Sequence, residues 1–85
     1  MKTAFVTGGS RGIGLAIVKE LGQNGYQIAL MATKTEEHYP ESSAALKAAG
    51  ITYLWIAGDV ASEEDRRQAL NQAVERFGRI DVLVN

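Results

Sequence analysis

Residues 7–14 read TGGSRGIG, a stretch that contains four of the chain's nine glycines together with one arginine. The apolar residues 4–6 come directly before it, and a run with apolar residues at helical spacing follows it. Glycine weakens regular structure, but it allows positive φ values and lets a ligand approach the backbone closely. A glycine cluster between a predicted strand and a predicted helix therefore indicates a loop shaped for a ligand.

The spacing of Gly8, Gly12 and Gly14 gives the pattern G-x-x-x-G-x-G. A helix that starts near Gly12 offers free N–H groups and a partial positive charge, which suit phosphate oxygens. We expect Gly8 to make the tight exit from the strand, Gly12 to admit a pyrophosphate, and Gly14 to let the helix pack closely on the sheet. The pattern is not a P-loop, because no Gly-Lys-Ser/Thr follows it. A plain glycine-rich turn is the alternative interpretation.

The remainder of the chain alternates between predicted strands and helices. The strands are predicted at residues 3–7, 26–33, 51–57 and 80–85, and the helices at 12–24, 41–49 and from the Ser62 cap to about Phe77. Apolar strands that alternate with helices favour a parallel sheet covered on both faces. Right-handed crossovers then fix most of the topology, and the most economical strand order is 3-2-1-4. This is the first half of a Rossmann-like, doubly wound α/β fold.

Apolar spacing also predicts which face of each helix is buried. The first helix is predicted to bury Ile13, Ala16, Ile17 and Leu21. The third is predicted to bury Ala69, Ala73 and Phe77, with Leu70 and Val74 beside them.

Composition narrows the class of protein. The 85 residues suggest one domain, and 46% hydrophobic with 22% charged residues is typical of a globular chain. The formal net charge of −1 gives no reason to expect a nucleic-acid or membrane partner. Without cysteine there are no disulfides or thiolate–metal sites, and no metal site is predicted. We expect a soluble, cytoplasmic protein.

The sequence TGGSRGIG resembles the T-G-x-x-x-G-x-G cofactor motif of the short-chain dehydrogenase/reductase family, and the resemblance covers all 85 residues. Asp59-Val60 resembles the family's Asp-Val pair that meets the adenine ring, and residues 81–85 (DVLVN) resemble the stretch that leads into its Asn-Asn-Ala-Gly motif. Within the family, the sequence GSRGIG is most similar to the corresponding motif of 3-oxoacyl-[acyl-carrier-protein] reductases and acetoacetyl-CoA reductases. The resemblance implies hydride transfer between a nicotinamide cofactor and a carbonyl substrate.

The end of the second predicted strand bears on the choice of cofactor. NAD sites usually carry an acid there for the ribose 2′-hydroxyl, whereas this chain reads Ala32-Thr33-Lys34. Arg11 is an available cation, and the family resemblance implies that it and Thr33 bind the 2′-phosphate of NADP. Arg11 and Lys34 as solvated surface cations are the alternative, and the nearby Glu36 and Glu37 weigh slightly against NADP. The prediction is NADP(H).

The predicted cofactor site comprises Gly8, Ser10, Arg11, Gly12, Ile13, Gly14, Thr33, Asp59 and Val60. For Asp59 the alternative is a local capping role, although Ser62 already suits that task. His38 is interpreted as a surface residue, and Tyr53 and Trp55 as packing residues.

No catalytic residue is predicted within the chain. The family's chemistry uses a serine and a Tyr-x-x-x-Lys pair after the fourth strand, and none of Tyr26, Tyr39 and Tyr53 has a lysine four residues later. One hypothesis is that residues 1–85 are the NADP-binding half of a longer reductase, which carries the activity and the carbonyl substrate. The other is a catalytically silent nucleotide-binding half-domain that self-associates through the open edge of its fourth strand.

Overall fold

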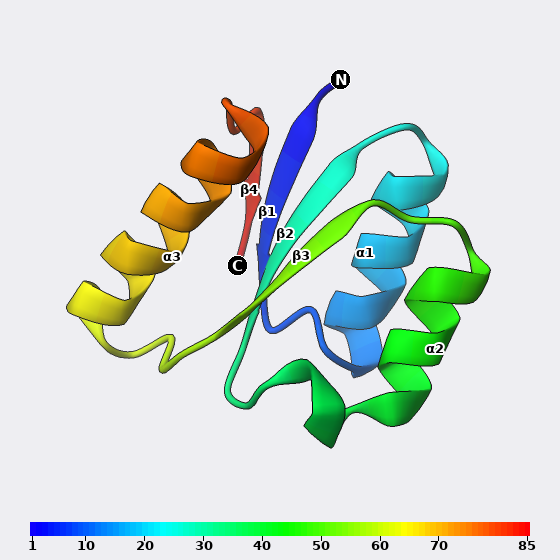
Figure 1. The fold of residues 1–85 in the computed structure, drawn as a ribbon, viewed down its shortest axis with the longest axis horizontal. Helices are drawn as coiled ribbons and strands as arrows, with labels where there is room; N and C mark the ends of the chain where they lie inside the picture. Colours follow the sequence, from blue (N-terminus) through cyan, green and yellow to red (C-terminus); the bar gives the residue numbers. More distant parts are fainter.

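A computed structural model describes all residues from 1 to 85 (Figure 1). The elements in chain order are β1 (Thr3–Thr7), α1 (Gly12–Gln23), β2 (Gln27–Ala32), a 3₁₀ turn η1 (Glu36–His38), α2 (Pro40–Ala48), β3 (Tyr53–Ala57), α3 (Glu63–Phe77) and β4 (Val82–Val84). The sheet has the order β3-β2-β1-β4, and every neighbouring pair is parallel. The predicted Rossmann-like fold and strand order are confirmed.

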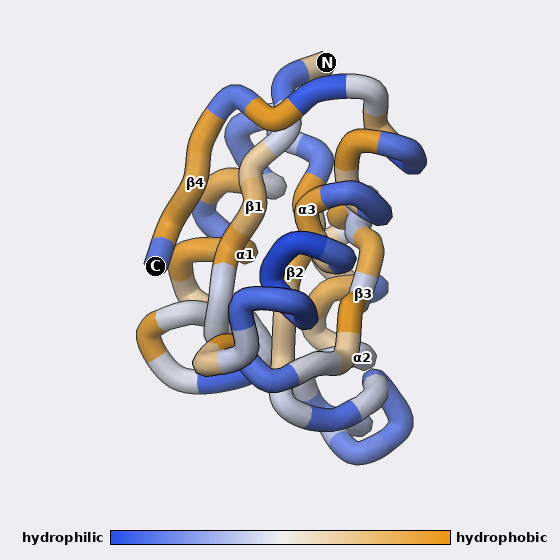
Figure 2. Tube along the Cα trace, turned by 90° about the vertical axis from the view of Figure 1, so that its left-hand side faces the viewer, coloured by the Kyte–Doolittle hydropathy of each residue, from blue (hydrophilic) through white to orange (hydrophobic).

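Helices cover both faces of the sheet, with α1 and α2 on one side and α3 on the other (Figure 1). Alternate side chains of β2 pack on opposite faces of the sheet, because successive side chains of a strand point in opposite directions. Ile28 and Leu30 lie in the cluster beneath α1 and α2, whereas Ala29 and Met31 lie in the cluster beneath α3. Figure 2 shows hydrophobic residues along the strands and hydrophilic residues in most of the connections. None of the helices is long and apolar enough to cross a bilayer.

The predicted buried face of α1 was wrong in part: Leu21 packs against the core and Ile17 is half-buried, but the other two residues face outward. Ile13 is 82% exposed and Ala16 is exposed, whereas Val18 is fully buried. The face turned inward runs through Gly14, Val18 and Gly22, where added Cβ atoms on the glycines would crowd neighbouring atoms. Apolar spacing missed this face, because two of its three positions carry no side chain. In α3, Ala69 and Ala73 are buried as predicted, but Val74 is 47% exposed.

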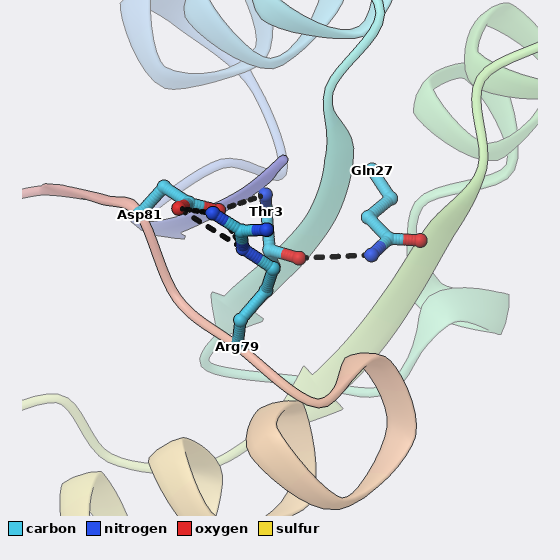
Figure 3. Close-up of polar contacts among 4 residues, drawn as sticks. All are labelled: Thr3, Gln27, Arg79 and Asp81. Atoms are coloured by element: carbon cyan, nitrogen blue, oxygen red, sulfur yellow. Dashed lines mark hydrogen bonds and ion pairs between the residues drawn. The ribbon is translucent and has the colours of Figure 1, made fainter. Parts of the chain in front are cut away.

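At its start β4 is joined to β1 by a small polar network (Figure 3). The Asp81 carboxylate accepts a hydrogen bond from the Thr3 N–H at 2.8 Å, and the Asp81 N–H donates to the Thr3 carbonyl at 2.8 Å. Arg79 donates to both oxygens of Asp81, at 2.6 to 3.1 Å. On the other side, Gln27 Nε2 donates to the Thr3 hydroxyl at 2.9 Å. These contacts set the register of β4 against β1.

Candidate cofactor-binding site

The glycine loop between β1 and α1 has the backbone shape that its glycines allow. Gly8 and Gly12 have φ values of +70° and +59°, in the left-handed region that favours glycine. A Cβ on Gly14 would collide with the Gly8 carbonyl oxygen and lie 2.8 Å from the Gly8 carbonyl carbon. Gly14 therefore brings α1 close to the loop itself. Gly14 was predicted to let α1 approach the sheet closely, but Gly9 is the residue that allows this approach. A Cβ on Gly9 would lie 2.9 Å from Val18 Cγ2 in α1 and 3.1 Å from Leu30 Cβ in β2.

The start of α1 presents unpaired N–H groups. Arg11 precedes the helix in an extended conformation, and no side chain caps the helix. The first N–H of this turn that forms a hydrogen bond is that of Leu15, which donates to the Arg11 carbonyl at 3.2 Å. The N–H groups of Gly12, Ile13 and Gly14 therefore have no acceptor in the chain. No acidic side chain lies in the first turn. This arrangement suits an anion.

Ser10 fixes the loop against α2. Its carbonyl accepts a hydrogen bond from the Ser42 hydroxyl, and both residues are buried. Sequence reasoning did not single out Ser42, because a serine inside a helix gives no sign of a contact 32 residues away.

Arg11 and Thr33, predicted to act together, line one cavity of about 350 Å³ with Lys34, His38 and Tyr39. We call this the cationic cavity. It adjoins a second cavity of about 310 Å³, which shares Arg11, His38 and Tyr39 with it and is also lined by the acid Glu41. Neither Arg11 nor Lys34 forms an ion pair within the chain, whose two ion pairs are Arg67–Glu64 and Arg79–Asp81. His38, interpreted as a plain surface residue, is exposed but lines both cavities.

Aromatic residues of β3 hold residues 33–39, the β2–α2 loop. Trp55 Nε1 donates to the Lys34 carbonyl at 2.9 Å, and the Tyr39 and Trp55 rings lie 5.3 Å apart. Tyr53 donates its hydroxyl to the Glu36 carboxylate. Tyr53 and Trp55 were interpreted as packing residues, and they do pack against the core. Their polar atoms also fix the loop that borders the cationic cavity.

Asp59 and Val60 follow β3 at the same edge of the sheet as the glycine loop, because the carboxyl ends of parallel strands share one edge (Figure 1). The Asp59 carboxylate accepts from the Ala61 N–H at 2.9 Å, which is the local capping role considered above. Ser62 caps α3 as predicted, accepting from the Asp65 N–H at 3.1 Å. Val60 is 43% exposed. Contact of this pair with adenine stays a prediction.

Comparison with known proteins places the chain in a family. The family model for short chain dehydrogenases matches residues 2–85. The chain therefore belongs to the short-chain dehydrogenase family, as its three motifs indicated.

Individual relatives agree with this assignment. The chain is 34% identical over 84 residues to a peroxisomal 2,4-dienoyl-CoA reductase of Arabidopsis thaliana, covering 99% of this chain and 28% of that protein. It is also 34% identical over 84 residues to 3-oxoacyl-[acyl-carrier-protein] reductase of Staphylococcus epidermidis, covering 99% of this chain and 34% of that protein. The chain thus spans about a third or less of the length of these relatives.

A solved structure of a short chain dehydrogenase from Burkholderia cenocepacia, in complex with NADP, has the same fold. Its TM-score is 0.85 at 40% sequence identity, covering 99% of this chain and 34% of that one. A nicotinamide cofactor and oxidoreductase chemistry are properties of the family to which the chain belongs.

Proposed function

We propose that residues 1–85 are the NADP(H)-binding half of a Rossmann-fold short-chain reductase. The observation that carries the proposal is the cationic cavity, in which Arg11, Thr33 and Lys34 meet at the end of β2 with no acid among the lining residues. A carboxylate at this point would favour the ribose 2′-hydroxyl of NAD, whereas unpaired cations favour a 2′-phosphate.

Each predicted site residue has a role in this proposal. The N–H groups of Gly12, Ile13 and Gly14 would hold the pyrophosphate, on a loop shaped by Gly8 and fixed through Ser10. The planar guanidinium of Arg11 would form bidentate hydrogen bonds to the 2′-phosphate. Lys34 would add a positive point charge, and Thr33 would add a hydroxyl group. Asp59 and Val60 would border the adenine. When bound, the nicotinamide supplies or accepts the hydride.

One relative supports a carbonyl substrate of the 3-oxoacyl type for the whole protein, because it is named as a reductase of 3-oxoacyl-[acyl-carrier-protein]. The relative named as a reductase of 2,4-dienoyl-CoA supports only the broader feature of an acyl group on a carrier, since its named substrate is a diene and not a ketone. The NADP complex of the Burkholderia dehydrogenase supports the choice of cofactor. A cytoplasmic location stays a prediction, to be checked by cell fractionation.

The open edge of β4 favours a second candidate function, a catalytically silent nucleotide-binding unit that self-associates. Strand β4 pairs only with β1, and its Leu83 is 57% exposed. Unpaired strand edges promote pairing with another chain. Light scattering tests this candidate: a monomer across the concentration range would contradict it.

A crystal structure of the protein with NADP⁺ tests the first proposal. We expect the 2′-phosphate within hydrogen-bond distance of the Arg11 guanidinium and the pyrophosphate at the start of α1. A 2′-phosphate that lies away from Arg11, Thr33 and Lys34 would contradict the proposal. The reaction would belong to the longer reductase and is tested there separately, by NADPH oxidation that depends on a 3-oxoacyl thioester such as acetoacetyl-CoA; residues 1–85 alone are expected to show no such turnover.

A further inference from the structure

Two acidic residues lie in the same loop as the cationic cavity but line a different one. Glu36 and Glu37 are the first two residues of the 3₁₀ turn η1, which ends at His38. They line a cavity of about 560 Å³ with Pro40, Ser43, Ala44 and Lys47, and neither of them lines the cationic cavity. The loop therefore separates its cations from its acids.

A specific set of contacts keeps Glu36 in its place. The carboxylate of this half-buried residue accepts hydrogen bonds from the Tyr53 hydroxyl and, at 2.7 Å, from the Ser43 hydroxyl. Partial burial raises the pKa of Glu36, but the bonds from Ser43 and Tyr53 and the charge of Lys47 outweigh it and hold the pKa below its ordinary value. Burial raises the pKa of Tyr53, and its bond to Glu36 raises it further. At neutral pH the pair is therefore a neutral phenol that donates to a full negative charge.

The position of this charge affects the two cofactors differently. Without the Tyr53 bond the Glu36 carboxylate keeps only its bond to Ser43 and is less firmly held, so its charge can turn toward Lys34 in the same loop, where it would repel a 2′-phosphate. It would not repel a 2′-hydroxyl, and an acid near the end of β2 is what NAD sites commonly use. Glu36 lies four residues after Ala32, the last residue of β2, and is the acid of this loop that Tyr53 binds. Another acid, Glu41 in the first turn of α2, lines the adjoining cavity with Arg11.

We propose that Tyr53 is a positioning residue for cofactor choice: by binding the Glu36 carboxylate outside the cationic cavity, it leaves that cavity free for the 2′-phosphate of NADP(H). The inference rests on the proposed function. Trp55 assists from the same strand through its bond to the Lys34 carbonyl.

The experiment measures the dissociation constants of NADPH and NADH for the wild-type protein, Tyr53→Phe, Glu36→Gln and the double variant. Tyr53→Phe removes only the hydroxyl, and we expect NADPH binding to weaken by about three- to tenfold with NADH binding unchanged or tighter. Glu36→Gln removes the charge and should leave NADPH binding unchanged or tighter. The double variant should regain wild-type affinity for NADPH. Tyr26→Phe is the matched control, because Tyr26 lies before β2, at the opposite end of that strand, and should change neither constant.

A purely structural role of Tyr53 predicts a different pattern. Tyr53→Phe would then weaken both cofactors alike, and Glu36→Gln would not rescue it. Either result, or a Tyr53→Phe variant with wild-type preference, would overturn this inference while the proposed function stands. A wild-type protein that does not prefer NADPH would overturn the proposed function, and this inference with it.

Discussion

The two ends of the sheet carry comparable polar residues but use them differently. At the amino end, Thr3, Gln27, Arg79 and Asp81 bind one another in a closed network (Figure 3). At the carboxyl end, Arg11 and Lys34 have no ionic partner, and three successive N–H groups of α1 have no acceptor. Polar groups that satisfy one another stabilise the fold, whereas polar groups held in place without partners are available to a ligand. The comparison predicts that substitutions at the two ends affect different quantities.

The largest effect on cofactor affinity is expected for Gly14→Ala. Its Cβ would meet the backbone of Gly8, which cannot move aside as a side chain can, so the glycine loop must shift. Overpacking costs about 1–3 kcal/mol, and a cost near the upper end, imposed on the loop shape that would hold the pyrophosphate, corresponds to a loss of roughly 100-fold in NADPH affinity. Isothermal titration calorimetry measures this loss. Gly22→Ala in the same helix is the control, because its Cβ would crowd only the Ile51 side chain. It should lower stability without changing affinity, and equal affinity losses in both variants would contradict this account.

Arg11→Ala is expected to have the next largest effect. A hydrogen bond to a charged group contributes about 1.5–3 kcal/mol, so NADPH affinity should fall by roughly 10- to 100-fold. NADH affinity and thermal stability should hardly change, because Arg11 is exposed and unpaired in the chain. Arg76→Ala removes an equal charge from α3, outside the residues that line the cationic cavity, and should leave both affinities as they are. An Arg11→Ala variant that binds NADPH normally would remove the main support for the 2′-phosphate site.

Lys34→Ala should have a smaller effect at the same end. Lysine is a mobile point charge, and exposed charge pairs contribute about 0.2–1 kcal/mol, which corresponds to roughly a two- to fivefold loss of NADPH affinity. Because the contribution is electrostatic and exposed, added salt should reduce the difference from wild type. A loss larger than that of Arg11→Ala would reverse the proposed order of the two cations.

Asp81→Asn should leave cofactor affinity unchanged and lower stability. Hydrogen bonds from Arg79, and then the Thr3 N–H and the charge of Arg79, hold the pKa of Asp81 below its ordinary value of 3.8. A lowered pKa in the folded state stabilises the protein above the ordinary pKa, and this contribution is lost as the pH falls through the folded pKa. We expect the variant to melt below wild type at neutral pH, with the gap closing as the pH falls below 3.8. A weaker affinity for NADPH would show that the two ends of the sheet are not independent.

The order of the elements could be predicted because it depends on local signals, and the strand order followed from the handedness of the crossovers between them. Apolar runs, capping residues such as Ser62 and the glycines after each helix all have meaning within a few residues. The inward face of α1 could not be predicted by counting apolar residues, since Gly14 and Gly22 contribute contact through the absence of a side chain.

The candidate site was predicted in part for the same reason. The glycine motif and the missing acid after β2 are local features, and they identified Arg11 and Thr33. The lining position of His38 and the anchoring of the loop by Tyr53 and Trp55 depend on how β3 and η1 meet in space. Nothing in the sequence near these residues indicates such contacts.

The account is tested most directly by titrating the wild-type protein with NADPH and NADH under identical conditions. The unpaired cations beside Thr33 predict that NADPH binds at least about tenfold more tightly than NADH, which corresponds to about 1.4 kcal/mol. Equal affinities, or tighter binding of NADH, would contradict the assignment of the cationic cavity to a 2′-phosphate.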